Sequence, residues 1–83
     1  MSNITILSGH GKSKRLRLIV SECEKSGKRV CVIESPISHI AAMAKIRAEL
    51  PAVVVMDDAG TIAVNILRHI AVTLPSVQFF IAQ

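Results

Sequence analysis

The segment Ser8-Gly9-His10-Gly11-Lys12-Ser13 contains the residue types that bind phosphate groups. It follows the apolar run Ile4–Leu7 and precedes a helical pattern that begins near Ser13. Glycines let the main chain approach an anion, and the first N–H groups of a helix point toward it. Lysine adds a positive charge, and a serine hydroxyl can reach a magnesium ion. We therefore predict phosphate contacts from Ser8, Gly9, His10, Gly11, Lys12 and Ser13.

A pair of acidic residues follows a second apolar run. Asp57 and Asp58 come directly after Ala52–Met56, which has no polar interruption. An unbroken apolar run is typical of a central parallel strand, because both faces of such a strand are covered. Ligands of parallel sheets bind beyond the carboxyl ends of the strands. We expect the glycine turn, the two aspartates and Gln83 to meet at that edge of the sheet.

The rest of the chain alternates short apolar runs with patterns of helical period. We predict strands at residues 3–7, 29–34, 52–56 and 77–82, and helices at 13–26, 35–50 and 60–74. The second helix is expected to begin at Ser35-Pro36, a capping residue followed by proline. Asp58 is a candidate cap for the third helix, which is predicted to carry Ile62, Ile66, His69, Ile70 and Thr73 on one face, with His69 at the surface or its boundary. The order β-α-β-α-β-α-β predicts one α/β domain over residues 1–83 with a four-stranded parallel sheet.

The glycine turn and the aspartate pair together resemble the Walker A and Walker B motifs of P-loop NTPases. Gly9-x-Gly11-Lys12-Ser13 follows a predicted strand, and Asp57-Asp58-Ala59 follows another, a pattern similar to the helicase-like branch. The resemblance implies a strand order of 2-3-1-4, although the flavodoxin-like order 2-1-3-4 fits the same alternation of elements. It also implies that ATP or another nucleotide binds together with Mg²⁺.

The same resemblance implies a role for each matching residue. Lys12 would neutralise phosphate charge, and Ser13 and Asp57 would hold the metal ion. Asp58 would be the catalytic residue that polarises the attacking water, and Gln83 would occupy a polar sensor position. The family's first loop glycine is replaced by Ile6. We expect hydrolysis only if a partner supplies the missing elements.

Charge and composition suggest a second function. The chain of 83 residues has a formal net charge of +4, and its basic residues gather in the first third. Such a patch favours polyanions, and we predict nucleic-acid contacts from Lys14, Arg15 and Arg17. The two phenylalanines are the only aromatic residues, which argues against a stacking platform for single-stranded nucleic acid.

The predicted second helix has a narrow polar arc. Apolar residues cover most of its circumference, which suggests burial on a second side and hence a homo-oligomer or a protein partner. Leu18 is expected among charged residues on the exposed side of the first helix. No apolar run reaches the length of a membrane span, and no signal-peptide pattern is present. We therefore expect a cytoplasmic location without membrane association.

Two functions remain open at this point. One is a reduced P-loop-like domain that binds a nucleotide or another phosphate group at Gly9–Ser13. The other is a non-enzymatic regulatory or adaptor protein that binds nucleic acid or a protein through its basic first helix or apolar second helix. Ile6 and Leu7 discriminate between them: a strand that includes both residues leaves a loop too short to wrap a triphosphate and favours the second function.

Overall fold

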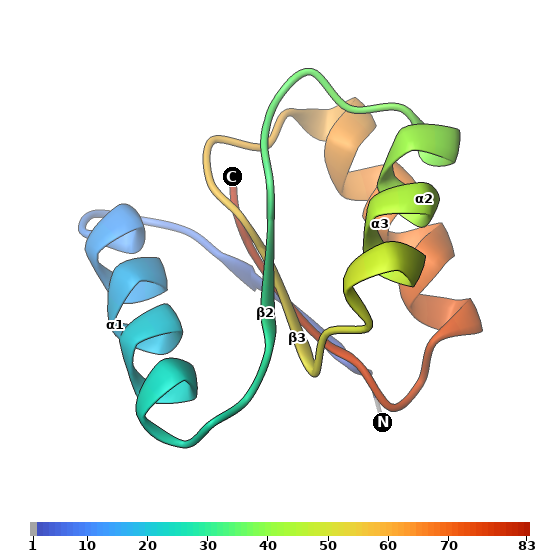
Figure 1. Cartoon of the computed structure of the whole chain (residues 1–83). Helices are drawn as coiled ribbons and strands as arrows, with labels where there is room; N and C mark the ends of the chain where they lie inside the picture. Colours follow the sequence, from blue (N-terminus) through green and yellow to red (C-terminus); the bar gives the residue numbers. More distant parts are fainter. Residues whose placement is uncertain (1) are drawn as a thin grey trace.

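The computed structural model describes residues 2–83, which form one parallel sheet with helices on both of its faces (Figure 1). The elements alternate in the predicted order β-α-β-α-β-α-β, so the predicted α/β class is confirmed. Their bounds are β1 (Ile4–Leu7), α1 (Lys12–Lys25), β2 (Val30–Ile33), α2 (His39–Glu49), β3 (Val53–Met56), α3 (Thr61–Thr73) and β4 (Gln78–Ala82).

The strands are parallel and lie in the order β1-β4-β3-β2. This order differs from the predicted 2-3-1-4 at one place, because β1 and β4 exchange positions and β1 becomes an edge strand. The burial of the two strands explains the difference. Phe79, Ile81 and Ala82 of β4 have no exposed surface, whereas Thr5 of β1 is exposed. A strand with both faces covered occupies an internal position.

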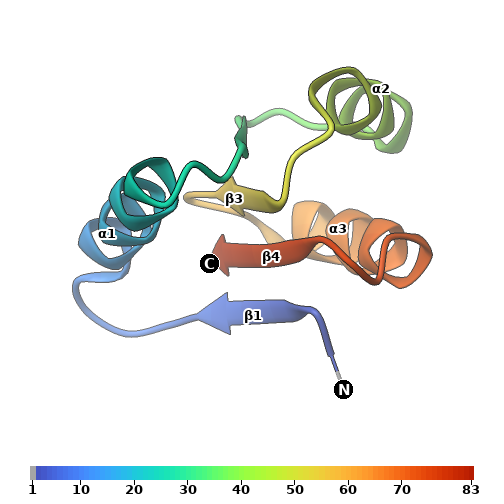
Figure 2. The same ribbon diagram turned by 60° about the horizontal axis from the view of Figure 1, so that its bottom comes forward.

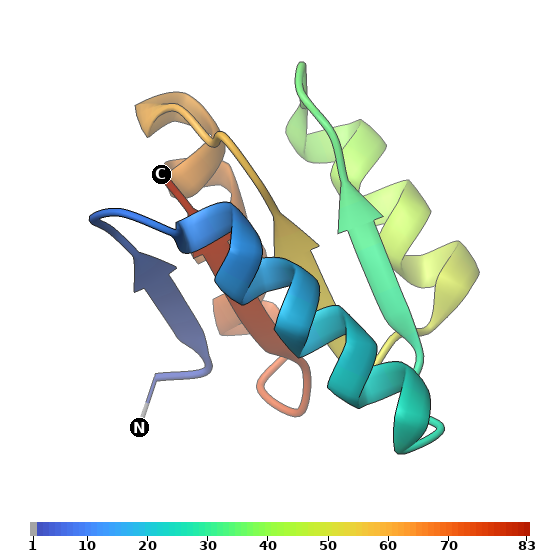
Figure 3. The same cartoon turned by 90° about the vertical axis from the view of Figure 1, so that its left-hand side faces the viewer.

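Helix α1 lies alone on one face of the sheet. Figure 2 shows it on the side opposite α2 and α3, and Figure 3 shows it crossing in front of β4 and β3. Its buried residue Leu16 packs with Leu7, Val53, Val55 and Ala82. One helix does not cover four strands, so Val32 on β2 keeps 43% of its surface exposed.

Helices α2 and α3 cover the other face and enclose the larger part of the core. Leu67 and Ile70 of α3 are fully buried there, together with Phe79, Met56 and Ile81 of the sheet. Within residues 2–83, none of the helices has the length and apolar character needed to cross a membrane.

Two details of these helices differ from the predictions. Helix α2 begins at His39, not at Ser35-Pro36, because the Ser38 hydroxyl accepts a hydrogen bond from the Ala41 N–H at 3.2 Å and caps the helix. The predicted face of α3 is confirmed at Ile70, which is fully buried, but it is wrong at Ile62, which is 76% exposed. The buried face is rotated and contains Ala63, Val64, Leu67, Ile70 and Ala71.

Candidate phosphate-binding site

The turn between β1 and α1 consists of residues 8–11. Ile6 and Leu7 precede it as members of β1, where they pair with Ile81 and Ala82. Gly9 and Gly11 adopt left-handed conformations with φ of 86° and 75°, which glycine reaches without the cost of a side chain. Ser8 and His10 are exposed in the same turn. The connection is therefore shorter than a loop that wraps a triphosphate.

The amino end of α1 has main-chain N–H groups without helical acceptors. Gly11 is the N-cap residue, and no side chain caps the helix there. The Arg15 N–H donates to the Gly11 carbonyl at 3.0 Å, the first bond of the helix, so the N–H groups of Lys12, Ser13 and Lys14 precede the helical hydrogen-bond pattern. No acidic residue occupies the first turn. The positive end of the helix dipole is therefore available to an anion.

The Lys12 side chain crosses from α1 to the end of β4. Its Nζ donates a hydrogen bond to the main-chain oxygen of Gln83, and Lys12 is half-buried. The Gln83 N–H in turn donates to the Leu7 carbonyl at 3.3 Å. The structure thus brings Lys12 and Gln83 together, and β4 lies between the turn and the aspartate pair.

Asp57 and Asp58 lie at the same edge of the sheet, in the connection from β3 to α3. The Asp57 Oδ1 accepts a hydrogen bond from the Asp58 N–H at 2.8 Å, and both residues are exposed. The Ala59 N–H donates to the Ala82 carbonyl at 2.8 Å and fixes this turn against β4. Asp58 does not cap α3, because Gly60 is the N-cap residue and no side-chain bond is made there.

Ser13 and Asp57 line one groove between α1 and the sheet. This groove, which we call the α1–β2 groove, has a volume of about 300 Å³. Its lining consists of Ser13, Leu16, Arg17, Val20, Val32, Val55 and Asp57. The two predicted magnesium ligands therefore face one space. Arg17, which is also one of the predicted nucleic-acid contacts, lies in the same lining.

The predicted nucleic-acid contacts are exposed. Lys14, Arg15 and Arg17 lie in the first half of α1 with solvent-accessible side chains. Leu18 is 57% exposed beside them, as predicted. The apolar surface of α2 also remains open, since Ile40 is 82% exposed. The expected oligomer or protein partner stays a prediction.

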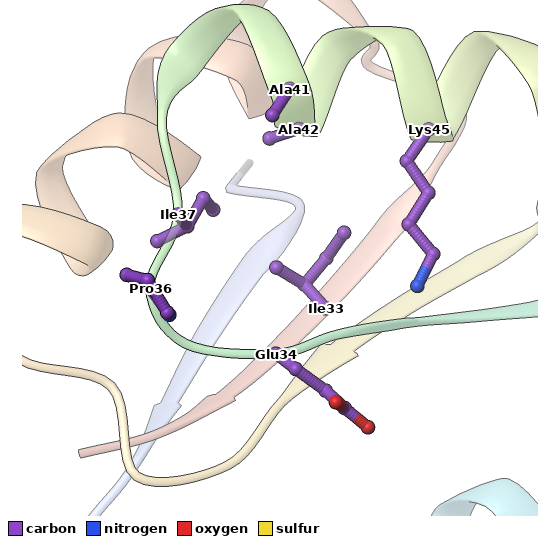
Figure 4. A pocket seen from close by; sticks show the side chains of 7 residues that line it. All are labelled: Ile33, Glu34, Pro36, Ile37, Ala41, Ala42 and Lys45. Carbon is purple, nitrogen blue, oxygen red and sulfur yellow. The ribbon is translucent and has the colours of Figure 1, made fainter.

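A second cavity of about 170 Å³ lies between α2 and the end of β2 (Figure 4). None of the predicted site residues lines it. The Lys45 side chain extends toward β2 and its Nζ donates to the Val32 carbonyl at 2.5 Å. This bond occupies an outward-facing carbonyl of an edge strand, which otherwise invites pairing with another chain. Lys45 therefore has a structural role, and the cavity is a weaker candidate for a site.

The two cysteines differ in their surroundings. Cys31 is fully buried in β2, and Cys23 is half-buried on α1. Burial, with a smaller contribution from the negative charge of Glu49, raises the pKa of the Cys31 thiol from 9.0 to about 11. A neutral buried thiol is inert. Cys31 therefore belongs to the core.

The sheet edge that carries the glycine turn and the aspartate pair offers few side chains that could bind a metal ion. Within residues 2–83, no group of three or more His, Cys, Asp or Glu side chains is placed to hold a metal ion. Ser13 and Asp57 carry a hydroxyl and a carboxylate, which are oxygen donors of the kind that Mg²⁺ binds, and both residues line the α1–β2 groove. Comparison of the chain with known protein families, curated proteins and solved structures gives no match.

Proposed function

We propose that the protein binds a phosphate group of a nucleotide or another phosphorylated ligand at the Gly9–Ser13 turn. The observation that carries this proposal is the uncapped amino end of α1, preceded by two left-handed glycines and flanked by the Lys12 side chain. Main-chain N–H groups and the helix dipole favour a negative charge at the turn, and the Lys12 ammonium, bonded to the Gln83 oxygen, adds positive charge at the same edge of the sheet. Mg²⁺ would be held by Ser13 and Asp57 together with the bound phosphate.

The short turn limits what this site can do. A connection of residues 8–11 has few N–H groups with which to surround three phosphates. Asp58 is exposed, and its N–H donates to the Asp57 carboxylate. We therefore propose binding without hydrolysis by this chain alone.

A titration followed through backbone amides tests the proposal. MgATP, adenosine monophosphate and inorganic phosphate are added separately to ¹⁵N-labelled protein. We expect saturable shifts at Gly9, Gly11, Lys12 and Ser13. The absence of shifts at these amides with millimolar ligand would remove the proposal.

A matched pair of lysine variants separates a specific site from general charge attraction. Lys12→Ala and Lys28→Ala each remove one positive charge, but Lys28 is exposed beyond the opposite end of α1. We expect Lys12→Ala to weaken phosphate binding at least tenfold and Lys28→Ala to change it less than twofold. Equal losses in the two variants would indicate that phosphate responds only to net charge.

The length of β1 favours a second candidate function. Because Ile6 and Leu7 belong to the strand, the phosphate at the turn could belong to a nucleic-acid backbone, with Lys14, Arg15 and Arg17 contacting neighbouring phosphates. Three such contacts predict a slope of about −2 to −3 for the logarithm of affinity against that of salt concentration. Fluorescence anisotropy with labelled oligonucleotides measures this slope at salt concentrations from about 50 to 200 mM.

The control for the salt titration is a second group of three basic residues, at and beyond the carboxyl end of α1. Simultaneous alanine substitution of Lys14, Arg15 and Arg17 is compared with simultaneous substitution of Lys25, Lys28 and Arg29, which has the same change in charge. Nucleic-acid binding through the first half of α1 predicts a loss in the first variant only. A salt-independent affinity would exclude this candidate.

A further inference from the structure

The α1–β2 groove opens directly beside the phosphate-binding turn. Ser13 belongs to both, because its main chain is part of the first turn of α1 and its side chain lines the groove. From Ser13 to Val20 the groove follows α1 for about 10 Å, at 1.5 Å per residue. A ligand whose phosphate occupies the turn therefore has space for a further chemical group along this helix.

The floor of the groove is apolar and partly open. Leu16 and Val55 are buried, Val20 is half-buried, and Val32 is 43% exposed although it lies on a sheet face. Helix α1 is the only helix on this face, so no other helix in the described part of the chain covers Val32. An apolar floor with a polar end is the usual construction of a small-molecule site.

The size and the charge of the groove narrow the ligand. A volume of about 300 Å³ is at the lower end for ligand pockets, which suits a single nucleoside. Arg17 and Asp57 both line the groove, so it offers one positive and one negative group, and a guanidinium group stacks on planar aromatic rings. The residue 8–11 turn is too short for three phosphates. These features favour one phosphate linked to one planar base.

We propose that the α1–β2 groove binds the nucleoside part of a nucleoside monophosphate, with the base on Val32 and Val55 and beside Arg17. The inference rests on the proposed phosphate site, since Ser13 joins the two. It adds a ligand class that the turn alone does not select. A sugar phosphate without a base would bind the turn but leave the groove empty.

Methyl and amide NMR on the complete chain tests the inference with three probes. Inorganic phosphate, ribose phosphate and adenosine monophosphate are titrated in parallel. We expect all three to shift the amides of Gly11 and Ser13, and only the nucleotide to shift the methyl groups of Leu16, Val32 and Val55. The nucleotide should bind about tenfold more tightly than ribose phosphate.

Two other outcomes of these titrations would overturn one or both proposals. If the nucleotide shifts the turn amides but not the groove methyl groups, or binds no more tightly than ribose phosphate, the inference is overturned and the phosphate site stands. If no probe shifts the turn amides, both proposals fail.

A pair of neutral variants provides a second test. Val32→Gln makes the floor polar, and Leu18→Gln makes the same kind of change on the exposed side of α1. We expect Val32→Gln to reduce nucleotide affinity to that of ribose phosphate without changing the affinity for inorganic phosphate. Leu18→Gln should leave both unchanged. Equal effects of the two variants would contradict the inference, and if Val32→Gln does not fold, the methyl shifts of the unmodified chain decide.

Discussion

The Asn3 side chain joins the start of β1 to the connection between α3 and β4. Its Nδ2 lies 3.0, 2.9 and 2.8 Å from the carbonyl oxygens of Ala71, Leu74 and Val77. The Asn3 carbonyl also accepts the Phe79 N–H at 2.8 Å. One half-buried amide thus satisfies the carboxyl end of a helix and the turn that leads into an internal strand.

The stability that the Asn3 side chain contributes can be worked out from the number of hydrogens that its amide donates. An NH₂ group has two hydrogens for three acceptors, and each net hydrogen bond stabilises a protein by about 0.5–1.5 kcal/mol. Asn3→Ala should therefore lower the free energy of unfolding by about 1–3 kcal/mol. Asn3→Asp should cost more at neutral pH, because a carboxylate would face carbonyl oxygens and donate nothing.

The direction in which the stability of Asn3→Asp changes with pH also follows from these contacts. In folded Asn3→Asp the new carboxyl group would face carbonyl oxygens. Its pKa would therefore lie above the value of about 3.9 that it has in the unfolded chain. The protonated form is then favoured by folding, so stability is highest below about pH 4 and falls as pH rises through the folded pKa. The pH dependence is measured as the difference in free energy of unfolding between Asn3→Asp and Asn3→Ala at each pH.

Urea unfolding followed by circular dichroism at several pH values measures these differences. Asn65→Ala and Asn65→Asp are the controls, because Asn65 is exposed on α3. We expect both controls to change stability by less than about 0.5 kcal/mol. The reasoning would be refuted if Asn3→Asp matched Asn65→Asp in stability and showed no additional pH dependence.

Four further predictions concern the core and one helix cap. Iodoacetamide at pH 8 should modify Cys23 in the folded protein and Cys31 only in denaturant, since burial raises the Cys31 pKa to about 11; equal modification in the folded protein would contradict this. Because that pKa is raised, stability should fall as pH rises from about 9 toward 11, and Cys31→Ala should flatten the decline in urea unfolding. Leu67→Ala should cost about 2–5 kcal/mol, as Leu67 has no exposed surface, and Ser38→Ala about 1 kcal/mol through loss of a cap; urea midpoints measure both, and unchanged midpoints would refute the assignments.

The order of elements could be predicted from the sequence because hydrophobic period is a local property. The unbroken run Val53–Met56 indicated an internal strand, and all four of its residues are buried. The positions of β1 and β4 required a comparison between strands. The polar Thr5 in β1 and the continuous apolar run Phe79–Ala82 in β4 contain that signal, whereas the order 2-3-1-4 follows only from the resemblance to P-loop NTPases.

The candidate site was predictable only in part, for a similar reason. Parallel topology places Gly11, Asp57 and Gln83 at one edge of the sheet without any knowledge of side-chain packing. The α1–β2 groove depends instead on how α1 crosses the sheet, which leaves Val32 uncovered and directs Arg17 into the lining. No local pattern in the sequence specifies the direction in which α1 crosses the sheet.

The amino end of α1 as an anion-binding site is the central claim, and the amide proton spectrum in phosphate tests it most directly. Hydrogen bonds from main-chain N–H groups to phosphate predict saturable downfield shifts at Gly11, Lys12 and Ser13 in sodium phosphate, and none in sodium chloride of equal ionic strength. Identical responses to the two salts, or shifts spread over the basic residues with none at these three amides, would contradict the account.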